Sequence, residues 1–222
     1  MNFAPTDDLG REIAERALDA LAPAQNEGRE AGVALTGGST PRAYLPALFA
    51  LPLDWRRIVL TLADDRLVPP AHPDSNAGLI EAARAGTPAA AARFVPLATR
   101  FDDPFAAAAE AGQRLPRLVP WPLDLAILGM GEDGHIASLF PELKPDLSVQ
   151  DICVGVGEAP PPNRHPRVSL SLEALLSARI ILLAVTGASK RAALERALAL
   201  PDGPLGMLAE RAGARLCIVA AP

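Results

Sequence analysis

The chain has 222 residues, of which 50% are hydrophobic and only 4% aromatic, and its formal net charge is -5. This length favours a single domain over residues 1–222, with a core built from aliphatic side chains. This negative net charge does not provide the positive surface that nucleic-acid binding needs. No apolar run approaches the roughly 18 residues of a membrane span. We therefore expect neither nucleic acid nor a membrane as a partner, and an anionic ligand would need a local group of cations.

The start of the chain and its cysteines favour a cytoplasmic protein. The first stretch, MNFAPTDDLGREIAERAL, is acidic and amphipathic, unlike a signal peptide. Cys153 and Cys217 lie in apolar, strand-like runs without metal-binding spacing, which predicts buried thiols. Only Lys144 and Lys190 are lysines among the 21 basic residues, so the place of each lysine is informative.

Predicted helices and strands alternate along the chain. Apolar residues at helical spacing predict a helix over residues 9–21. A short or kinked helix ending near residue 49 is then expected, with Thr40 as its N-cap and Pro41 at its first helical position. Further helices are expected at 76–84, at 104–115 with Asp103 as its cap, at 173–177 and within 187–200. Strands are expected at 33–35, 58–62, 94–95, 123–128, 152–156, 168–172, 179–185 and 215–220. Without a composition break or an internal repeat, this alternation predicts an α/β fold with a mainly parallel sheet.

The stretch GMGEDGHIASLFP, residues 129–141, directly follows an apolar run typical of a buried parallel strand. Its glycines predict a sharp turn at the carboxyl end of that strand, where ligands bind in open α/β sheets. Asp133 and His135 lie in this turn, and IASLF (136–140) is expected to form a first helical turn. A solvated Asp and an incidental His are the alternative. General acid/base catalysis suits an imidazole placed there.

The other histidines and the common nucleophile motifs carry less information. His72 and His165 lie in Pro-rich loops and are expected to be solvated. No second His or Cys stands at metal-ligand spacing from His135, so a metal site is not expected. There is also no G-x-S-x-G motif for a serine nucleophile.

The strand-GGSTP-helix unit predicts a phosphate site, because glycines allow close backbone approach and a helix N-terminus presents unpaired N–H groups. Its residues are Gly37, Gly38, Ser39 and Thr40. The alternative is a capped helix after a tight turn. Arg66, Arg167 and Lys190 could supply charge. For each of them the alternative is a structural role without a ligand, such as a local ion pair of Arg66 with the preceding acids, Asp64 and Asp65.

Four segments together resemble the 6-phosphogluconolactonases in order and separation. They are ALTGGSTP, LADDRLVP with HPDSNAGL, LAILGMGEDGHIASLFP, and RVSLSL with LLAVTGASKRAAL. The resemblance runs from about residue 32 to 194. It implies a three-layer α/β/α fold like that of glucosamine-6-phosphate deaminase and ribose-5-phosphate isomerase. The implied activity is hydrolysis of 6-phospho-D-glucono-1,5-lactone, in the oxidative pentose phosphate pathway, without metal or cofactor.

The same resemblance implies roles for individual residues. His135 would be the general base, with Asp133 and Arg66 as further catalytic residues. The substrate and its phosphate would be bound by Gly37, Gly38, Ser39, Thr40, Asp64, Arg66, Arg167 and Lys190. The family usually reads Asp-Glu-Arg where this chain has Asp64-Asp65-Arg66, so the shorter Asp65 could hold Arg66 differently.

Two other functions are consistent with this resemblance. One is a glucosamine-6-phosphate deaminase/isomerase-like enzyme, and the other is a non-catalytic sugar-phosphate sensor. The ASLFP continuation favours the lactonase, and the short segment before the first predicted strand leaves no room for a DNA-binding module. We expect a monomer or a small homo-oligomer whose partner is a small sugar-phosphate lactone.

Overall fold

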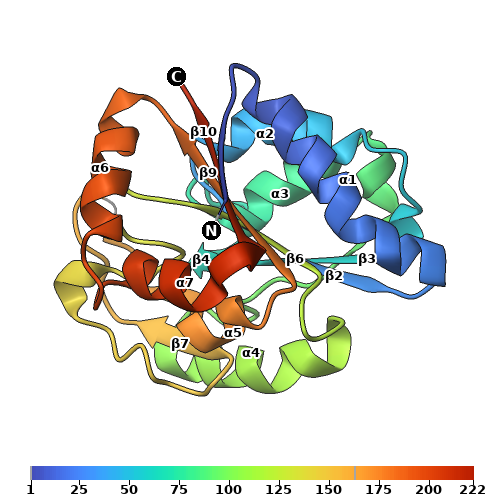
Figure 1. Ribbon diagram of the computed structural model, residues 1–222. Coiled ribbons are helices and arrows are strands. Elements are labelled where there is room, and N and C mark those ends of the chain that lie inside the picture. Colours follow the sequence, from blue (N-terminus) through green and yellow to red (C-terminus); the bar gives the residue numbers. More distant parts are fainter. Residues whose placement is uncertain (1, 163) are drawn as a thin grey trace.

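The computed structural model describes residues 2–162 and 164–222. A parallel sheet runs through the middle of the molecule (Figure 1), and it has seven strands. The strand order is β1-β10-β9-β6-β2-β3-β5, and all neighbouring strands pair in parallel. The bounds are β1 Asn2–Pro5, β2 Ala31–Leu35, β3 Ile58–Leu62, β5 Arg93–Phe94, β6 Leu125–Gly129, β9 Ile180–Thr186 and β10 Leu216–Ala221. The inner strands are near-continuous aliphatic runs buried on both faces, as central parallel strands require.

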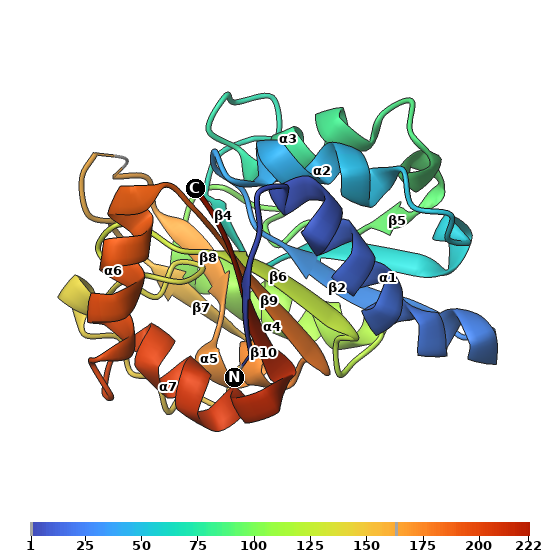
Figure 2. The same ribbon diagram turned by 45° about the horizontal axis from the view of Figure 1, so that its top comes forward.

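Helices cover both faces of this sheet (Figures 1 and 2). The bounds are α1 Leu9–Glu27, α2 Pro41–Phe49, α3 Asn76–Arg84, α4 Pro104–Leu118, α5 Leu172–Leu176, α6 Ala188–Leu198 and α7 Pro204–Ala212. Helices α1, α2 and α3 lie together on one side, and α4, α5 and α7 lie on the other. This is the expected α/β fold. Within the described residues, no helix combines the length and apolarity needed to cross a membrane.

A second, three-stranded antiparallel sheet packs on the α4 side of the molecule, and the sequence patterns do not predict it. Its strands are β4 Asp64–Arg66, β8 Arg167–Leu170 and β7 Cys153–Val156, in the order β4-β8-β7. Strand β4 is only three residues long and largely charged, so it lacks the apolar pattern of a strand. In the register of β4 and β8, Arg66 lies directly opposite Arg167.

Most predicted elements are confirmed, with small shifts at their ends. The helix at 76–84 and the strand at 58–62 have the predicted bounds, and Asp103 caps α4 through the backbone N–H groups of Phe105 and Ala106. Helix α1 extends beyond the prediction, past Pro23, to a left-handed C-cap at Gly28. Strand β1 and helix α7 were not predicted. Both cysteines are free and buried, as expected.

The predicted helical turn at residues 136–140 is wrong. Ala137 has φ 48°, in the left-handed region, so no right-handed helix passes through it. The backbone N–H of Ser138 donates to Ser169 Oγ at 3.1 Å, and Ser138 Oγ donates to Asp64 Oδ2 at 2.6 Å. These bonds to side chains take the place of a helical ladder. The segment therefore bends back on itself, with Ile136 bridging to Met130 and Leu139.

Candidate active site

The candidate site lies where the strand order reverses. From β2 the sheet continues to β3 and β5 on one side, whereas β6 borders β2 on the other side. The carboxyl ends of β2 and β6 therefore open into one crevice, the place where open α/β sheets bind ligands. A cavity of about 180 Å³ lies there. It is lined by Thr36, Gly37, Gly38, Ser39, Thr40, Asp64, Arg66, Asn76, Gly129, Met130, Gly131, His135, Ala137, Arg167 and Lys190.

His135 is held by the loop that follows β6. Its Nδ1 lies 2.6 Å from Asp133 Oδ1, and its backbone N–H donates to the same oxygen at 3.2 Å. Burial would raise the pKa of Asp133, but the hydrogen bonds and charge of His135 outweigh burial and lower it. With Nδ1–H donating to this carboxylate, the ring keeps a lone pair on Nε2.

Gly131 makes room for this arrangement. A Cβ at position 131 would lie 2.3 Å from His135 Nδ1 and Cε1 and 2.4 Å from Asp133 Oδ1. The loop closes through the Gly131 N–H, which donates to the His135 carbonyl at 3.0 Å. On its other side the imidazole packs on Phe140, with 4.5 Å between ring centroids. The glycine and the aromatic ring together restrict where the imidazole can lie.

Two arginines reach the cavity from the second sheet, where they are paired across β4 and β8. Arg66 Nη1 donates to the carbonyl of Asp74 at 2.7 Å, and Arg167 Nε donates to the carbonyl of His165 at 3.2 Å. Arg167 is buried, which lowers its pKa, although Asp64 Oδ2 lies 3.7 Å from its Nη1 and opposes that effect. The two like charges share one end of the crevice, an arrangement that favours a bound anion.

Lys190 supplies a third cation from the first turn of α6. Its Nζ donates to Thr40 Oγ1 at 3.3 Å. Burial lowers its pKa from the usual 10.5, and Glu132 partly opposes that effect. An ammonium at a helix N-terminus is also disfavoured by the helix dipole, so a bound anion would relieve both costs.

The GGST turn also lines the cavity. Thr40 stands at the N-cap of α2 with helical backbone angles, but its side chain makes no capping bond to the backbone. The predicted capping role of its hydroxyl is therefore wrong, and that hydroxyl instead accepts from Lys190. Gly38 has φ 95°, which favours glycine. A Cβ on Gly37 would overlap the amide of Asn76.

Asp65, on β4, caps the N-terminus of α3. Its carboxylate accepts from the backbone N–H groups of Arg66, Asn76 and Ala77 at 2.7–3.1 Å. Burial raises the pKa of Asp65 to about 7, because desolvation outweighs these three donors. Arg66 is oriented instead by the Asp74 carbonyl, so the shorter side chain at position 65 does not leave Arg66 unsupported.

Comparison with known proteins places the chain in a family. The pattern described as Glucosamine-6-phosphate isomerases/6-phosphogluconolactonase matches residues 4–216. The chain belongs to this family.

Relatives and solved structures agree with this placement. A 6-phosphogluconolactonase from Mesorhizobium japonicum is 38% identical over 205 residues, which cover 89% of this chain and 84% of the relative. One from Pseudomonas aeruginosa is 41% identical over 199 residues, covering 87% and 81%. The crystal structure of a 6-phosphogluconolactonase from Shewanella baltica superposes with a TM-score of 0.89 at 29% identity, covering 100% of this chain and 98% of that one. A monomeric glucosamine-6-phosphate deaminase of the NagB superfamily shares the fold, with a TM-score of 0.78 at 19% identity, covering 100% of this chain and 97% of that one.

Within this family fold, the residues singled out in the sequence lie together. Every residue predicted to act in catalysis or in substrate binding lines the cavity, except Asp133, which contacts His135. Sequence reasoning missed Thr36, Asn76 and Ala137. Asn76 is 2% exposed, its Nδ2 donates to the Asp64 carbonyl, and its Oδ1 has no partner among the described residues. The one signal for Asn76 was its place at a helix start directly after the HPDS turn.

A larger cavity, of about 460 Å³, opens at the amino ends of the strands. It is also rich in arginine, but these side chains have partners. Arg29 Nη2 lies 2.7 Å from Asp124 Oδ1, and Arg179 Nε lies 3.5 Å from the same oxygen. Arg215 donates to the carbonyls of Leu176 and Ala178. Among the residues that the structure describes, no histidine lines this cavity, so the imidazole of the crevice has no counterpart there.

Proposed function

We propose that this chain hydrolyses 6-phospho-D-glucono-1,5-lactone to 6-phospho-D-gluconate. The relatives that are 38–41% identical over most of the chain bear the name 6-phosphogluconolactonase, which supports this substrate. The observation that carries the proposal is the pairing of His135 with Asp133 in a cavity that also holds Arg66, Arg167 and Lys190. That combination offers a base for water and a group of cations for an anion in the same cavity.

His135 is the proposed general base. Asp133 holds the imidazole with its proton on Nδ1, so Nε2 can accept a proton from water as the water oxygen attacks the lactone carbonyl. The bond between the carbonyl carbon and the ring oxygen then breaks. The ring oxygen takes the proton back from the imidazolium, whose charge Asp133 stabilises. The products are a carboxylic acid, which ionises, and a free hydroxyl.

The cations and the GGST turn are proposed to bind the phosphate and orient the ring. Arg66, Arg167 and Lys190 supply local positive charge in a chain whose net charge is -5. Binding energy from the phosphate, which does not react, can hold the lactone carbonyl against His135. The oxyanion that develops on that carbonyl needs hydrogen-bond donors. Arg66 and the backbone N–H groups of the glycine turns are the candidates in this cavity.

The proposal is tested by following acid release from the lactone, with the spontaneous rate subtracted. We expect rapid hydrolysis by the wild type and no release of ammonia from glucosamine 6-phosphate. Ammonia release without lactone hydrolysis would establish the deaminase alternative. Binding of both sugar phosphates without turnover would establish a sensor.

The base assignment is tested by His135→Asn, whose amide can still donate to Asp133 but cannot act as a base. We expect kcat to fall by roughly 10² or more, the usual contribution of a general base, with KM within several-fold of the wild type. A variant with near-wild-type kcat would show that another group activates the water.

A further inference from the structure

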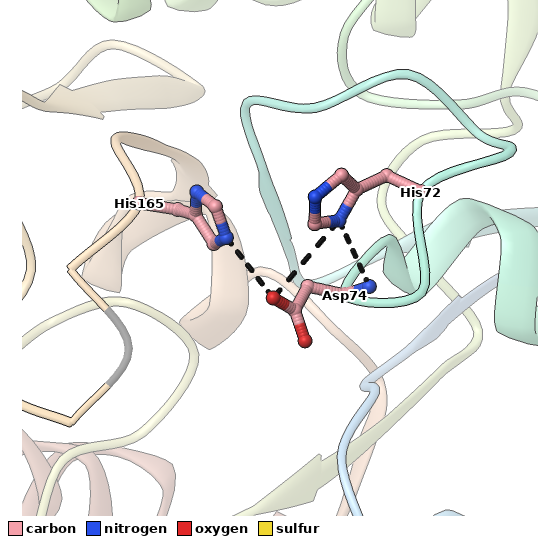
Figure 3. A group of neighbouring side chains, drawn as sticks. All are labelled: His72, Asp74 and His165. Carbon is pink, nitrogen blue, oxygen red and sulfur yellow. Dashed lines mark hydrogen bonds and ion pairs between the residues drawn. The ribbon is translucent and has the colours of Figure 1, made fainter.

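His72, Asp74 and His165 form a compact group of side chains (Figure 3). His165 Nε2 lies 3.0 Å from Asp74 Oδ2, and His72 Nδ1 lies 4.0 Å from the same oxygen. The two imidazoles meet edge to face, with 5.2 Å between centroids. His72 and Asp74 belong to the loop after β4, and His165 belongs to the loop before β8. Two loops about ninety residues apart in the sequence therefore meet at this group.

The donor set fits a divalent ion of the zinc class. Two imidazole nitrogens and one carboxylate oxygen are ligands that Zn²⁺ binds, and a water would complete a four-coordinate site. Bonds of about 2.0–2.1 Å in tetrahedral geometry separate neighbouring ligands by about 3.3 Å. The three ligand atoms here already lie within 4.8 Å of one another. Small side-chain rotations therefore suffice to close the site.

The surroundings of the two histidines favour the forms that bind metal. The backbone N–H of Asp74 donates to His72 Nδ1 at 3.1 Å, so this nitrogen carries a lone pair rather than a proton. An ion bound to His72 Nδ1 would displace the Asp74 N–H, which would then donate to water instead. Water can reach this N–H because the side chains of His72, Asp74 and His165 are 39%, 42% and 32% exposed. At His165 the ion would replace the proton that now links Nε2 to Asp74. The same exposure gives an ion a path from solvent.

We propose that His72, Asp74 and His165 form a binding site for one divalent zinc-class ion, which joins the two loops. The backbone carbonyls of two of these ligands hold the arginines of the cavity. Asp74 O accepts from Arg66, and His165 O accepts from Arg167. The ion therefore fixes the supports of both arginines without entering the cavity. It stabilises the fold locally and takes no part in the proposed reaction, so the inference does not rest on that function.

The test uses the full-length protein after removal of metal with a chelator, titrated with Co²⁺ as a spectroscopic probe and then with Zn²⁺. We expect one Co²⁺ per chain, with the visible absorption of a four- or five-coordinate nitrogen/oxygen site. Cys153 and Cys217 are buried, so no thiolate-to-cobalt band should appear. At a free Zn²⁺ concentration 100 times Kd, Tm should rise by roughly 5–10 °C for a chain of this size.

The three histidines of the chain supply the variants and the control. His72→Asn and His165→Asn should each weaken Co²⁺ binding by about 100-fold or more, because loss of an outer-shell partner alone costs 10–100-fold. His135→Asn should leave Co²⁺ binding unchanged. Absence of saturable binding to the wild type would overturn the site, as would unchanged affinity in both loop variants. If those variants fold poorly, X-ray absorption of the wild-type Zn²⁺ complex decides instead: two imidazoles support the site, and sulfur ligands contradict it.

Discussion

At the scale of single residues, Lys190 is the cation whose contribution is easiest to isolate. Its ammonium lies 3.3 Å from Thr40 Oγ1 in a partly desolvated position, which lowers its pKa. Lys190→Ala should weaken binding of 6-phosphogluconate by ~1.5–3 kcal/mol, the scale of a hydrogen bond to a charged group. Calorimetric titration of 6-phosphogluconate measures this loss. Lys144→Ala is the matched control, because Lys144 is exposed and is not among the residues that line the cavity.

The role of Lys190 can be separated from a general effect on the site by its substrate and pH dependence. Lys190→Ala should lose much of the wild-type kcat/KM for the phosphorylated lactone and little of the wild-type kcat/KM for unphosphorylated gluconolactone. Because a neutral amine cannot pair with phosphate, the advantage of the wild type should shrink as pH rises through the lowered pKa of Lys190, below 10.5. Equal losses on both lactones would mean that Lys190 supports the fold or the chemistry, and its phosphate role would be withdrawn.

At the scale of elements, the loop after β6 shows what a short motif can and cannot predict. The apolar run and its glycines correctly indicate a strand and a turn that carries His135. The helical turn expected at 136–140 fails because Ser138 bonds to Ser169 and Asp64, which lie on other strands. Those partners are distant in the sequence, so local periodicity holds no information about them.

The same loop gives a prediction about Gly131. An added Cβ would lie 2.3 Å from the imidazole of His135, so Gly131→Ala should displace the ring from Asp133. We expect kcat for the lactone to fall by more than about tenfold, since misplacement of a catalytic group by 1 Å can cost 10²-fold. The far-ultraviolet circular dichroism should be unchanged. Steady-state kinetics and circular dichroism of the purified variant measure both quantities.

Gly112→Ala in α4 is the control for this substitution. Its added Cβ would meet only the Cys153 backbone nitrogen, at 3.8 Å, an ordinary contact. Alanine is also favoured over glycine within a helix. Gly112→Ala should therefore keep wild-type kinetics. Unchanged kcat in Gly131→Ala would mean that the ring tolerates the methyl group, and the positioning role of Gly131 would be wrong.

At the scale of the whole molecule, the sequence predicts the main sheet better than the second one. Aliphatic runs identify the inner strands of the main sheet, and the order of the helices between them makes it parallel. The pairing of β4 with β8 joins segments about one hundred residues apart, one of them only three residues long. No local pattern specifies that register. The family resemblance alone implied that Arg66 and Arg167 share one site, and the meeting of His72 with His165 could be seen only in three dimensions.

Asp64 joins the loop after β6 to strand β8 of the second sheet, and it gives the final prediction. The residue is 4% exposed. Its carboxylate accepts a hydrogen bond from Ser138 Oγ, in the loop after β6, at 2.6 Å. The same carboxylate lies 3.7 Å from Arg167 Nη1 on β8. Asp64→Asn can keep one hydrogen bond but removes the charge that faces a buried guanidinium. Because a buried ion whose partner is removed typically costs 3–5 kcal/mol, we expect stability to fall by about 3 kcal/mol. Urea unfolding should show a lower midpoint with an unchanged m-value.

The exposed Asp146→Asn is the control and should stay within about 0.5 kcal/mol of the wild type. If Asp64→Asn matched that control, the ion pair between Asp64 and Arg167 would contribute nothing net to the stability of the fold.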